Sequence, residues 1–497
     1  MATPLENSRM PPPRATYRPP APEPQASQLS VFRLMTTLRR NPLECWAKDH
    51  FEKPIVVGGL PIGHVLVVND PSAIRRVLLE NAGNYRKDSL QRRVLSAGLG
   101  DGLLSAEGKQ WRTQRRILAP VFARKTIASF APAMADAAAA LVERWSGHDR
   151  RTVDVAAEMS RVTLDVLERT IFSDGLGREA EEFRVAMVTY FNTIGRIDPL
   201  DVLGVPAFVP RFSQWRVRST LRFFEAAIDE IIATRRRRLS ENSATTANDI
   251  LTLLLAALDP DTGQRMTEAE VRSNILTFIA AGHETTANLL SWSLFLLSQS
   301  PEWRRRLESE AARELDGPVA GLADRLPETR AVIDEAIRLY PPIAAISRVA
   351  DDADELAGEK VRRGSIVVIA PYVLHRHRLL WRDPDLFDPT RFLGAARSEI
   401  DRYAYLPFGA GARTCIGSAF ALQEATWVLA TIVKNFDLRL DADAEIRPLL
   451  RVTLRPAGGL PMIVRTKPPE TPALRRQPYR PAHQDGRTLQ AGKRQIG

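Results

Sequence analysis

The chain has 497 residues, and 44% hydrophobic with 26% charged residues is an ordinary composition for a globular protein with a large core. Its net charge of +10 first suggests nucleic acid or an anionic membrane, but the tail 466–497, with seven Lys and Arg against two acids, supplies half of that charge. No helix-turn-helix or RNA-binding signature accompanies the basic residues, so we expect no nucleic-acid binding.

Cysteine usage and hydropathy bear on the location of the protein. The two cysteines, Cys45 and Cys415, exclude a disulfide framework and a cysteine-rich zinc site, and they suit a reducing cytoplasm. No apolar run approaches the roughly 18–20 residues that span a bilayer. The first residues have no signal-peptide layout. We therefore expect a cytoplasmic protein without a transmembrane anchor.

The two ends of the chain differ in composition from its middle. The first 24 residues contain eight prolines, so we expect residues 1–27 to be disordered or extended, because proline fits neither a sheet ladder nor a helix interior. Residues 466–497 are predicted to form a second, basic disordered tail. Residues 28–465 show no linker and no internal repeat, which predicts one domain.

Apolar spacing predicts a mainly α fold with a small β component. Helices are expected at 130–145, 156–172, 217–239 and 271–298, and strands at 55–57, 64–68 and 365–370. The strands would form a small sheet near each end of the domain. The helix 271–298 exceeds the usual 8–20 residues, which indicates an element buried through the middle of the fold.

Two stretches combine charged residues at helical spacing. Trp111 and Arg115 lie one turn apart on one helix face, in a stretch that would otherwise be read as a basic amphipathic helix. Glu335 and Arg338 form an i, i+3 pair, which is worth only about 0.2–0.5 kcal/mol when exposed. Neither pair indicates a function by itself.

The long helix contains a polar stretch, Ala280-Ala-Gly-His-Glu-Thr-Thr286. A glycine inside a helix costs roughly 1 kcal/mol relative to alanine, so a purely structural helix would rarely contain one. Thr285 can bond back to the carbonyl of Ala281 and bend the helix, and Glu284 beside it can transfer protons. Hydrogen-bonded core is the alternative interpretation.

Three histidines could suggest a metal site. His283 has no second His or Cys at i±3 or i±4, and His375 and His377 also lack a partner at helical spacing. We interpret all three as structural or surface residues.

The most informative segment is Phe408-Gly-Ala-Gly-Ala-Arg-Thr-Cys-Ile-Gly417, which precedes an apolar, helix-forming run. Its glycines permit turns that a β-carbon would hinder, and Arg413 places a permanent cation beside the Cys415 sulfur. A helix that begins just after Cys415 would direct its N-terminal amides and positive dipole end toward a thiolate. An inert buried cysteine is the commoner case, but this pattern favours a thiolate metal ligand.

With F-x-x-G-x-R-x-C-x-G matched at every fixed position, and Ala421 and Glu424 also in place, the chain resembles the cytochrome P450 family. The stretch 280–286 is similar to the family's A-G-x-[D/E]-T oxygen-activation motif, and the other motifs follow in the family's order. The resemblance implies the cytochrome P450 fold, with the long central helix over a haem.

The resemblance also implies roles for individual residues. Cys415 would ligate the iron of haem b, iron protoporphyrin IX, and Glu284 and Thr285 would deliver protons to dioxygen. The remaining cofactor-binding positions are Trp111, Arg115, Arg348, Phe408, Arg413 and Gly417. The structural triad is Glu335, Arg338 and Arg391, although the family often has Pro-Glu-Arg-Phe where this chain has Pro-Thr-Arg-Phe.

A member of this family would insert one atom of dioxygen into a lipophilic small molecule, by hydroxylation or epoxidation. Because the sequence shows no flavin or iron–sulfur signature, a ferredoxin or flavodoxin with its NAD(P)H-dependent reductase would supply electrons. This acidic donor would dock on Arg112, Arg116, Arg124 and Lys125. A haem-thiolate peroxygenase, dehydratase or isomerase is the nearer alternative, although retention of Glu284 and Thr285 argues against it. A haem-based binding or sensor protein is the further one.

The substrate pocket should be lined by residues 93–103, 189–212 and 343–346, which are largely apolar. Such a lining favours a terpenoid, a fatty acyl chain or a polycyclic compound and does not choose among them.

Overall fold

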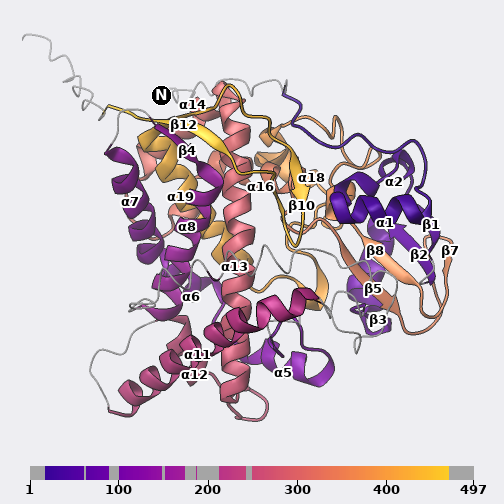
Figure 1. The fold of residues 1–497 in the computed structure, drawn as a ribbon, viewed down its shortest axis with the longest axis horizontal. Helices are drawn as coiled ribbons and strands as arrows, with labels where there is room; N and C mark the ends of the chain where they lie inside the picture. The colour runs from indigo at the N-terminus through magenta and orange to yellow at the C-terminus, as the bar shows by residue number, and fades with distance from the viewer. Residues whose placement is uncertain are drawn as a thin grey trace, which may run out of the picture. The chain divides into compact units, whose positions relative to one another are not determined.

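The computed structural model describes residues 17–60, 63–88, 100–147, 151–173, 186, 212–241 and 249–468. The chain divides into a first unit, Met1–Thr466, and a second unit, Lys467–Gly497, of which only Lys467 and Pro468 are described. Nearly all of the predicted tail 466–497 therefore lies outside the described residues. The elements labelled in Figure 1 belong to the first unit.

Helices dominate the described part of this unit, as the sequence predicts (Figure 1). The longer helices are α1 (Val31–Arg40), α5 (Gly108–Leu118), α7 (Ala131–Ser146), α8 (Val155–Leu167), α11 (Phe212–Ser240), α13 (Glu268–Ser298), α14 (Pro301–Glu314), α16 (Pro327–Leu339) and α19 (Ser418–Asn435). The shorter ones are α2 (Lys48–Glu52), α3 (Pro71–Arg75), α6 (Arg124–Ser129), α12 (Ile250–Ala256), α15 (Leu322–Arg325), α17 (Pro371–Leu374) and α18 (Gly394–Glu399). The π-helical segments are η2 (Arg76–Glu80) and η4 (Glu168–Phe172), and the 3₁₀ segments are η1 (Pro42–Cys45), η3 (Ala82–Asn84), η6 (Pro389–Phe392) and η7 (Gly411–Arg413). The four predicted helices correspond to α7, α8 with η4, α11 and α13.

The central helix α13 begins at a reciprocal cap. The Thr267 hydroxyl accepts the Glu270 backbone N–H at 3.3 Å, and the Glu270 carboxylate accepts the Thr267 N–H at 3.0 Å, which satisfies two N-terminal donors. Every residue from 286 to 297 is buried, because the helix packs against α8, α16 and α19. A helix that is apolar on all sides belongs in the core, and Figure 1 shows α13 running between these helices.

The β structure brings together distant parts of the chain. One five-stranded sheet has the order β1-β2-β8-β5-β3, and the parallel pair β2–β8 places Val65 opposite Ile366. Its strands are β1 (Ile55–Leu60), β2 (Gly63–Val68), β3 (Tyr85–Arg86), β5 (Ile346–Ala350) and β8 (Ile366–Ile369). The expected division into one sheet near each end is thus wrong for strand 366–369, because local alternation does not encode the pairing partner.

The other strands form smaller sheets. A three-stranded sheet of order β4-β12-β9 comprises β4 (Arg151–Asp154), β9 (Phe436–Leu440) and β12 (Pro461–Thr466). Two hairpins are formed by β6 (Asp354–Leu356) with β7 (Glu359–Val361), and by β10 (Pro448–Leu450) with β11 (Leu454–Pro456). No helix in the described ranges is long and apolar enough to cross a membrane.

The described part of the proline-rich N-terminal segment, which starts at Tyr17, contacts the core. The Tyr17 ring meets Phe295 edge-on with 6.3 Å between centroids, and the Tyr340 hydroxyl donates to the Pro20 carbonyl at 2.8 Å. Residues 17–24 form no helix or strand, as their prolines predict. Our expectation of disorder is nevertheless wrong for residues 17–27, because these long-range contacts hold the extended segment against the core.

Candidate active site

A largely apolar cavity of about 430 Å³ lies against the middle of α13 and the start of α19. The structure brings all nine residues predicted to serve catalysis or cofactor binding to its wall: Trp111, Arg115, Glu284, Thr285, Arg348, Phe408, Arg413, Cys415 and Gly417. These residues come from widely separated parts of the chain, so the fold assembles what the motifs imply separately.

The loop before Cys415 depends on glycine. Gly409 and Gly411 have φ of 70° and 72°, in the left-handed region that disfavours a β-carbon. A β-carbon on Gly411 would also lie 1.8 Å from the Leu78 carbonyl oxygen. The Cys415 N–H donates to the Phe408 carbonyl at 2.9 Å, and α19 begins three residues after the cysteine, as predicted.

The Cys415 thiol opens into the cavity while protein surrounds it closely on its other sides. Burial raises the pKa of the Cys415 thiol, and the Gly417 backbone N–H and the Arg115 charge act in the opposite direction. A bound cation would add a stronger preference for the thiolate. A single thiolate ligand suits a cofactor that supplies the other metal ligands itself, as haem does.

Partly buried cations line the same cavity. Burial lowers the pKa of Arg348, and the nearby Arg413 charge lowers it further. Arg413 donates to Glu107 at 2.7 Å and lies 4.2 Å above the Trp111 ring. Burial also lowers the pKa of Arg115.

The sequence reasoning missed a fourth cation on this wall, Lys87, which is only 7% exposed. Its ammonium donates to the Leu104 carbonyl and lies 3.9 Å from Glu107. Among the described residues, the acids close to these four cations are Asp88 and Glu107, so the cations outnumber them. This excess of buried and partly buried positive charge fits a group with two carboxylates, such as the propionates of haem. Nothing in the local sequence around Lys87 signals the role.

The polar stretch of α13 forms another part of the wall. The Thr285 hydroxyl donates to the Ala281 carbonyl at 2.5 Å, as predicted from the sequence. Gly282 lies against Leu167, whose side chain would be 3.2 Å from an added β-carbon. The helix glycine therefore serves close packing against α8.

Glu284 projects from the same stretch toward the β10–β11 hairpin. Its Oε1 atom lies 3.7 Å from the Arg455 guanidinium, and its buried Oε2 atom has no hydrogen-bond partner among the described residues. Burial raises the pKa of Glu284, whereas the Thr453 hydroxyl and the Arg455 charge oppose this shift. Glu284 thus holds a proton more readily than an exposed carboxyl group.

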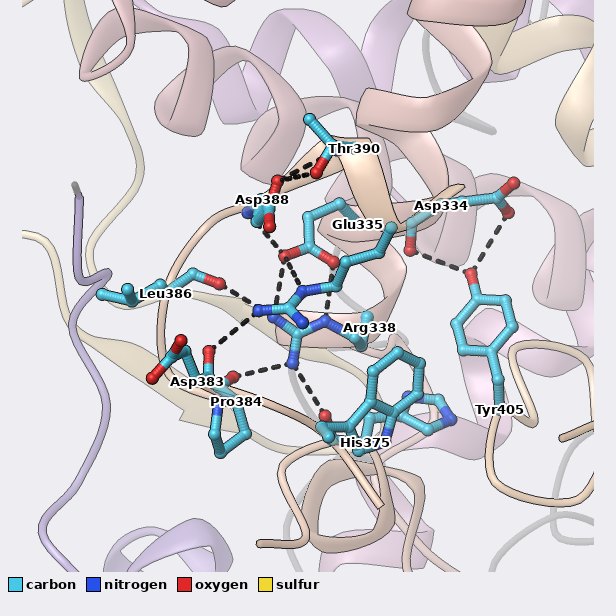
Figure 2. A network of polar contacts seen from close by, with 12 residues as sticks. Asp334, Glu335, Arg338, His375, Asp383, Pro384, Leu386, Asp388, Thr390 and Tyr405 are labelled. Carbon is cyan, nitrogen blue, oxygen red and sulfur yellow. Dashed lines mark hydrogen bonds and ion pairs between the residues drawn. The ribbon is translucent and has the colours of Figure 1, made fainter. Parts of the chain in front are cut away.

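The predicted triad forms a network of polar contacts (Figure 2), and none of its three residues lines the cavity. Arg338 donates two hydrogen bonds to Glu335, at 2.6 and 2.7 Å, and both residues are fully buried. Its other bonds go to the backbone carbonyls of His375, Pro384 and Leu386. Arg391 joins at 3.7 Å from Glu335 and donates to the Asp383 carbonyl.

All three histidines that we interpreted as structural or surface residues are buried. His283 Nε2 lies 3.0 Å from the Ser160 hydroxyl, His375 accepts the Leu406 N–H at 2.8 Å, and His377 lies 3.0 Å from the Lys53 carbonyl. Burial lowers the pKa of His375 to about 3. Within the described ranges, no group of three or more His, Cys, Asp or Glu side chains could hold a metal ion.

The four cations predicted to bind the electron donor differ in whether they are ion-paired or exposed. Arg116 is paired with the buried Asp259, at 2.8 and 3.1 Å, and with Asp261 at 3.2 Å. Arg112 and Arg124 are exposed, as is Lys125. The ion pairs of Arg116 remove it from the freely available positive surface.

The predicted substrate-lining segments are only partly described. Residues 93–99 and 189–211 lie outside the described residues, as does the side chain of Phe212. Of the remaining positions, Leu103, Ile343 and Ile346 line the cavity.

Comparison with known proteins identifies the family of this chain. A family model described as "Cytochrome P450" matches residues 39–461. Cyclooctat-9-en-7-ol 5-monooxygenase of Streptomyces melanosporofaciens is 33% identical over 405 residues, which cover 81% of this chain and 86% of that protein. Pentalenene oxygenase of Streptomyces avermitilis is 33% identical over 367 residues, 71% of this chain and 78% of that protein.

A third relative, the bifunctional cytochrome P450/NADPH–P450 reductase 2 of Bacillus subtilis, is 32% identical over 76% of this chain but only 36% of its own length. Matches of this extent define the class: the chain belongs to the cytochrome P450 family. It is a monooxygenase with a haem-iron cofactor, an oxidoreductase.

Proposed function

We propose that this protein uses haem b to hydroxylate or epoxidise a lipophilic small molecule, with electrons from separate redox proteins. One observation carries the proposal: the Cys415 thiol opens into the same apolar cavity as four buried or partly buried cations and the Glu284–Thr285 pair. A thiolate ligand, a site for two carboxylates and a proton-carrying pair are the parts that haem-based oxygen insertion requires.

The cavity residues divide the work of holding the cofactor. Cys415 would bind the iron, Phe408 and Gly417 would shape the loop around the thiolate, and the cations would bind the propionates. These cations are Arg115, Arg348, Arg413 and Lys87, and Trp111 packs against Arg413. Bound haem would supply dioxygen activation, and its thiolate ligand favours cleavage of the O–O bond.

Glu284 and Thr285 would move protons within the cavity. The raised pKa of Glu284 brings its protonation closer to neutral pH, where an efficient proton carrier should titrate. The Thr285 hydroxyl is positioned by its bond to the Ala281 carbonyl. Apolar side chains elsewhere on the wall would exclude bulk water from this step.

The nature of the wall supports a lipophilic substrate. Leu103, Phe278, Leu289 and Ile346 are among the apolar side chains that line it. Two relatives are named after pentalenene and cyclooctat-9-en-7-ol, which agrees with an apolar substrate class. We infer a terpenoid, a fatty acyl chain or a polycyclic compound.

We also infer that a ferredoxin or flavodoxin, with its NAD(P)H-dependent reductase, supplies the electrons. The exposed Arg112, Arg124 and Lys125 on α5 and α6 support this, because exposed cations speed encounter with an acidic protein. The cytoplasmic location remains a prediction based on cysteine usage.

Substitution of the cysteine tests the proposal. In Cys415→Ser, the long-wavelength Soret band that carbon monoxide gives with reduced thiolate-bound haem should disappear. Cys45→Ser is the matched control, because burial raises the pKa of the Cys45 thiol to about 12 and that residue does not line the cavity. A normal carbonyl spectrum from Cys415→Ser would refute the assignment. Turnover that depends on NAD(P)H and an electron donor would separate a monooxygenase from a peroxygenase, an isomerase or a sensor.

A further inference from the structure

The loop that precedes α5 supplies part of the cavity wall. Residues 100–107 form turns rather than a helix or strand, and Leu103 and Leu104 line the cavity. The backbone groups of such a loop need hydrogen-bond partners outside regular secondary structure. A loop with few partners adapts to different ligands, whereas a loop that is held at several points keeps one shape. The contacts of this loop therefore determine which molecules the wall accepts.

Two buried amide side chains, Asn274 and Gln114, hold this loop, and we call them the amide clamp. The Leu103 N–H donates to the Asn274 side-chain oxygen at 2.9 Å, and the Gln114 amide donates to the Asp101 carbonyl at 2.8 Å. The Asn274 amide nitrogen also donates to the Gln114 side-chain oxygen at 3.3 Å. Since Gln114 lies on α5 and Asn274 on α13, which are labelled in Figure 1, the clamp ties the loop to both helices.

The hydrogen bonds of Asn274 fix the orientation of its amide. Its nitrogen donates to the Glu270 carbonyl at 2.8 Å, one turn earlier in α13. A flipped amide would turn its NH₂ group toward the Leu103 N–H, so that two donors would face each other. A buried polar network whose groups are satisfied favours a single arrangement, because other arrangements leave a buried polar group without a partner.

The loop backbone also packs closely against α13. A β-carbon added to Gly102 would lie 2.6 Å from the Ser273 carbonyl oxygen, so this position has no room for a side chain. Gly100 has a φ of 58°, and a β-carbon there would lie 2.6 Å from the Ser273 hydroxyl. The Lys87 ammonium donates to the Leu104 carbonyl. Close packing and hydrogen bonds therefore both resist movement of the loop away from the cavity.

We propose that Asn274 and Gln114 are positioning residues that set the substrate selectivity of the cavity by fixing its wall at Leu103 and Leu104. Neither amide lines the cavity, so both act through the loop and not by contact with a substrate. The proposal rests on the proposed monooxygenase function and adds to it a determinant of specificity. With the clamp intact, the wall cannot move away from a bulky molecule, and the resulting clash excludes that molecule.

Two ligands of different size that bind haem iron measure the selectivity of the wall. Imidazole needs little space beyond the iron, whereas clotrimazole carries bulky aryl rings on the same imidazole group. The shift of the Soret band gives the Kd of each ligand for the haem-bound protein. In Asn274→Leu the ratio of the clotrimazole Kd to the imidazole Kd should fall several-fold, because the wall can then move. An unchanged or higher ratio overturns the proposal.

Asn69→Leu is the matched control for the loss of a buried asparagine. Asn69 is buried, donates to the His50 carbonyl at 2.9 Å and does not line the cavity. This variant should lose unfolding free energy, as Asn274→Leu does, but it should keep the parent ratio of the two Kd values. An equal fall of the ratio in both variants would show that any loss of stability has this effect, and it would refute the positioning role.

Gln114→Met tests the other half of the clamp, also in the event that Asn274→Leu does not fold. It removes the bond to the Asp101 carbonyl, so the Kd ratio should fall here as well. In the double variant the ratio should fall no further than in the more affected single variant, because both residues act on one loop. Additive effects would refute a single clamp.

Hydrogen exchange of the peptide 100–106 measures the loop without any ligand. Exchange should be several-fold faster in Asn274→Leu and Gln114→Met than in the parent or Asn69→Leu, because the backbone amides of the loop then open more often. Unchanged exchange in both clamp variants overturns the proposal. Failure of the monooxygenase function would instead appear as a normal carbonyl spectrum in Cys415→Ser, which hydrogen exchange does not measure.

Discussion

Two ionic regions of this protein, one fully buried and one partly buried, differ in how their charges are balanced. In the Glu335–Arg338 network both side chains are fully buried, and every nitrogen of the Arg338 guanidinium has an acceptor (Figure 2). Beside the cavity, four cations lie close to only two acids of the described residues, Asp88 and Glu107, and the Arg413 charge disfavours the charged form of Arg348. These cations are Lys87, Arg115, Arg348 and Arg413.

The difference shows how buried charge can be interpreted in a protein without a bound ligand. A charge that is balanced inside the chain holds segments of the fold together, here α16 and the backbone at 375–391. An excess of charge of one sign inside the protein does not stabilise the fold, because desolvation and repulsion both oppose it. Such an excess indicates that a separate molecule of opposite charge binds to these side chains.

The largest effect is expected in the balanced region. Arg338→Met should destabilise the protein by about 3–5 kcal/mol, because it leaves Glu335 buried without its partner. Urea unfolding at neutral pH measures the loss. The matched control is Lys53→Met, which breaks an exposed i, i+4 pair with Asp49 and should cost about 0.5 kcal/mol or less. A similar loss in both variants would contradict the structural role of the network.

Removal of a cavity cation should weaken haem binding without destabilising the fold. Arg348→Met should leave the unfolding free energy of the haem-free protein unchanged or slightly higher, because it removes a desolvated cation next to Arg413. It should weaken haem retention by roughly 10–100-fold, the value of one lost hydrogen bond to a charged group. Transfer of haem to a scavenging protein measures retention, and the exposed Arg112→Met is the control. If Arg348→Met loses stability without losing haem, the cation excess does not serve a cofactor.

The smallest effect is expected for the ion pair of Arg116 and Asp259, in which Asp259 is buried and Arg116 is partly exposed. The hydrogen bond from Arg116 lowers the pKa of Asp259 from its ordinary 3.8 to about 2. Because the folded-state pKa is depressed, this stabilisation is complete above about pH 4 and is lost as pH falls toward 2. Asp259→Asn should therefore flatten the fall in unfolding free energy over this interval. Urea titrations at several pH values check this; identical slopes for parent and variant would show that the pair does not contribute.

The cysteine loop and the long helix could be predicted because the residues that determine their backbone conformation are close together in the sequence. Gly409 and Gly411 are needed for positive φ angles within a few residues of Cys415, and the Thr285–Ala281 bond closes within one helical turn. The Glu335–Arg338 pair is also local, although its complete burial depends on backbone carbonyls up to 48 residues away. Patterns with the period of a helix or the geometry of a turn remain visible in the sequence.

The sequence by itself determined the family motifs, the identity of the thiolate ligand candidate and most of the helices. Only the tertiary structure decided which strands share a sheet, that Lys87 lines the cavity with the other cations, and that Arg455 lies beside Glu284. It also pairs Arg116 with Asp259, 143 residues away, and Asn288 with Thr453, 165 residues away. The physical reason is that a side chain's local sequence sets its backbone conformation, whereas its charge partners are set by which distant segments pack against it.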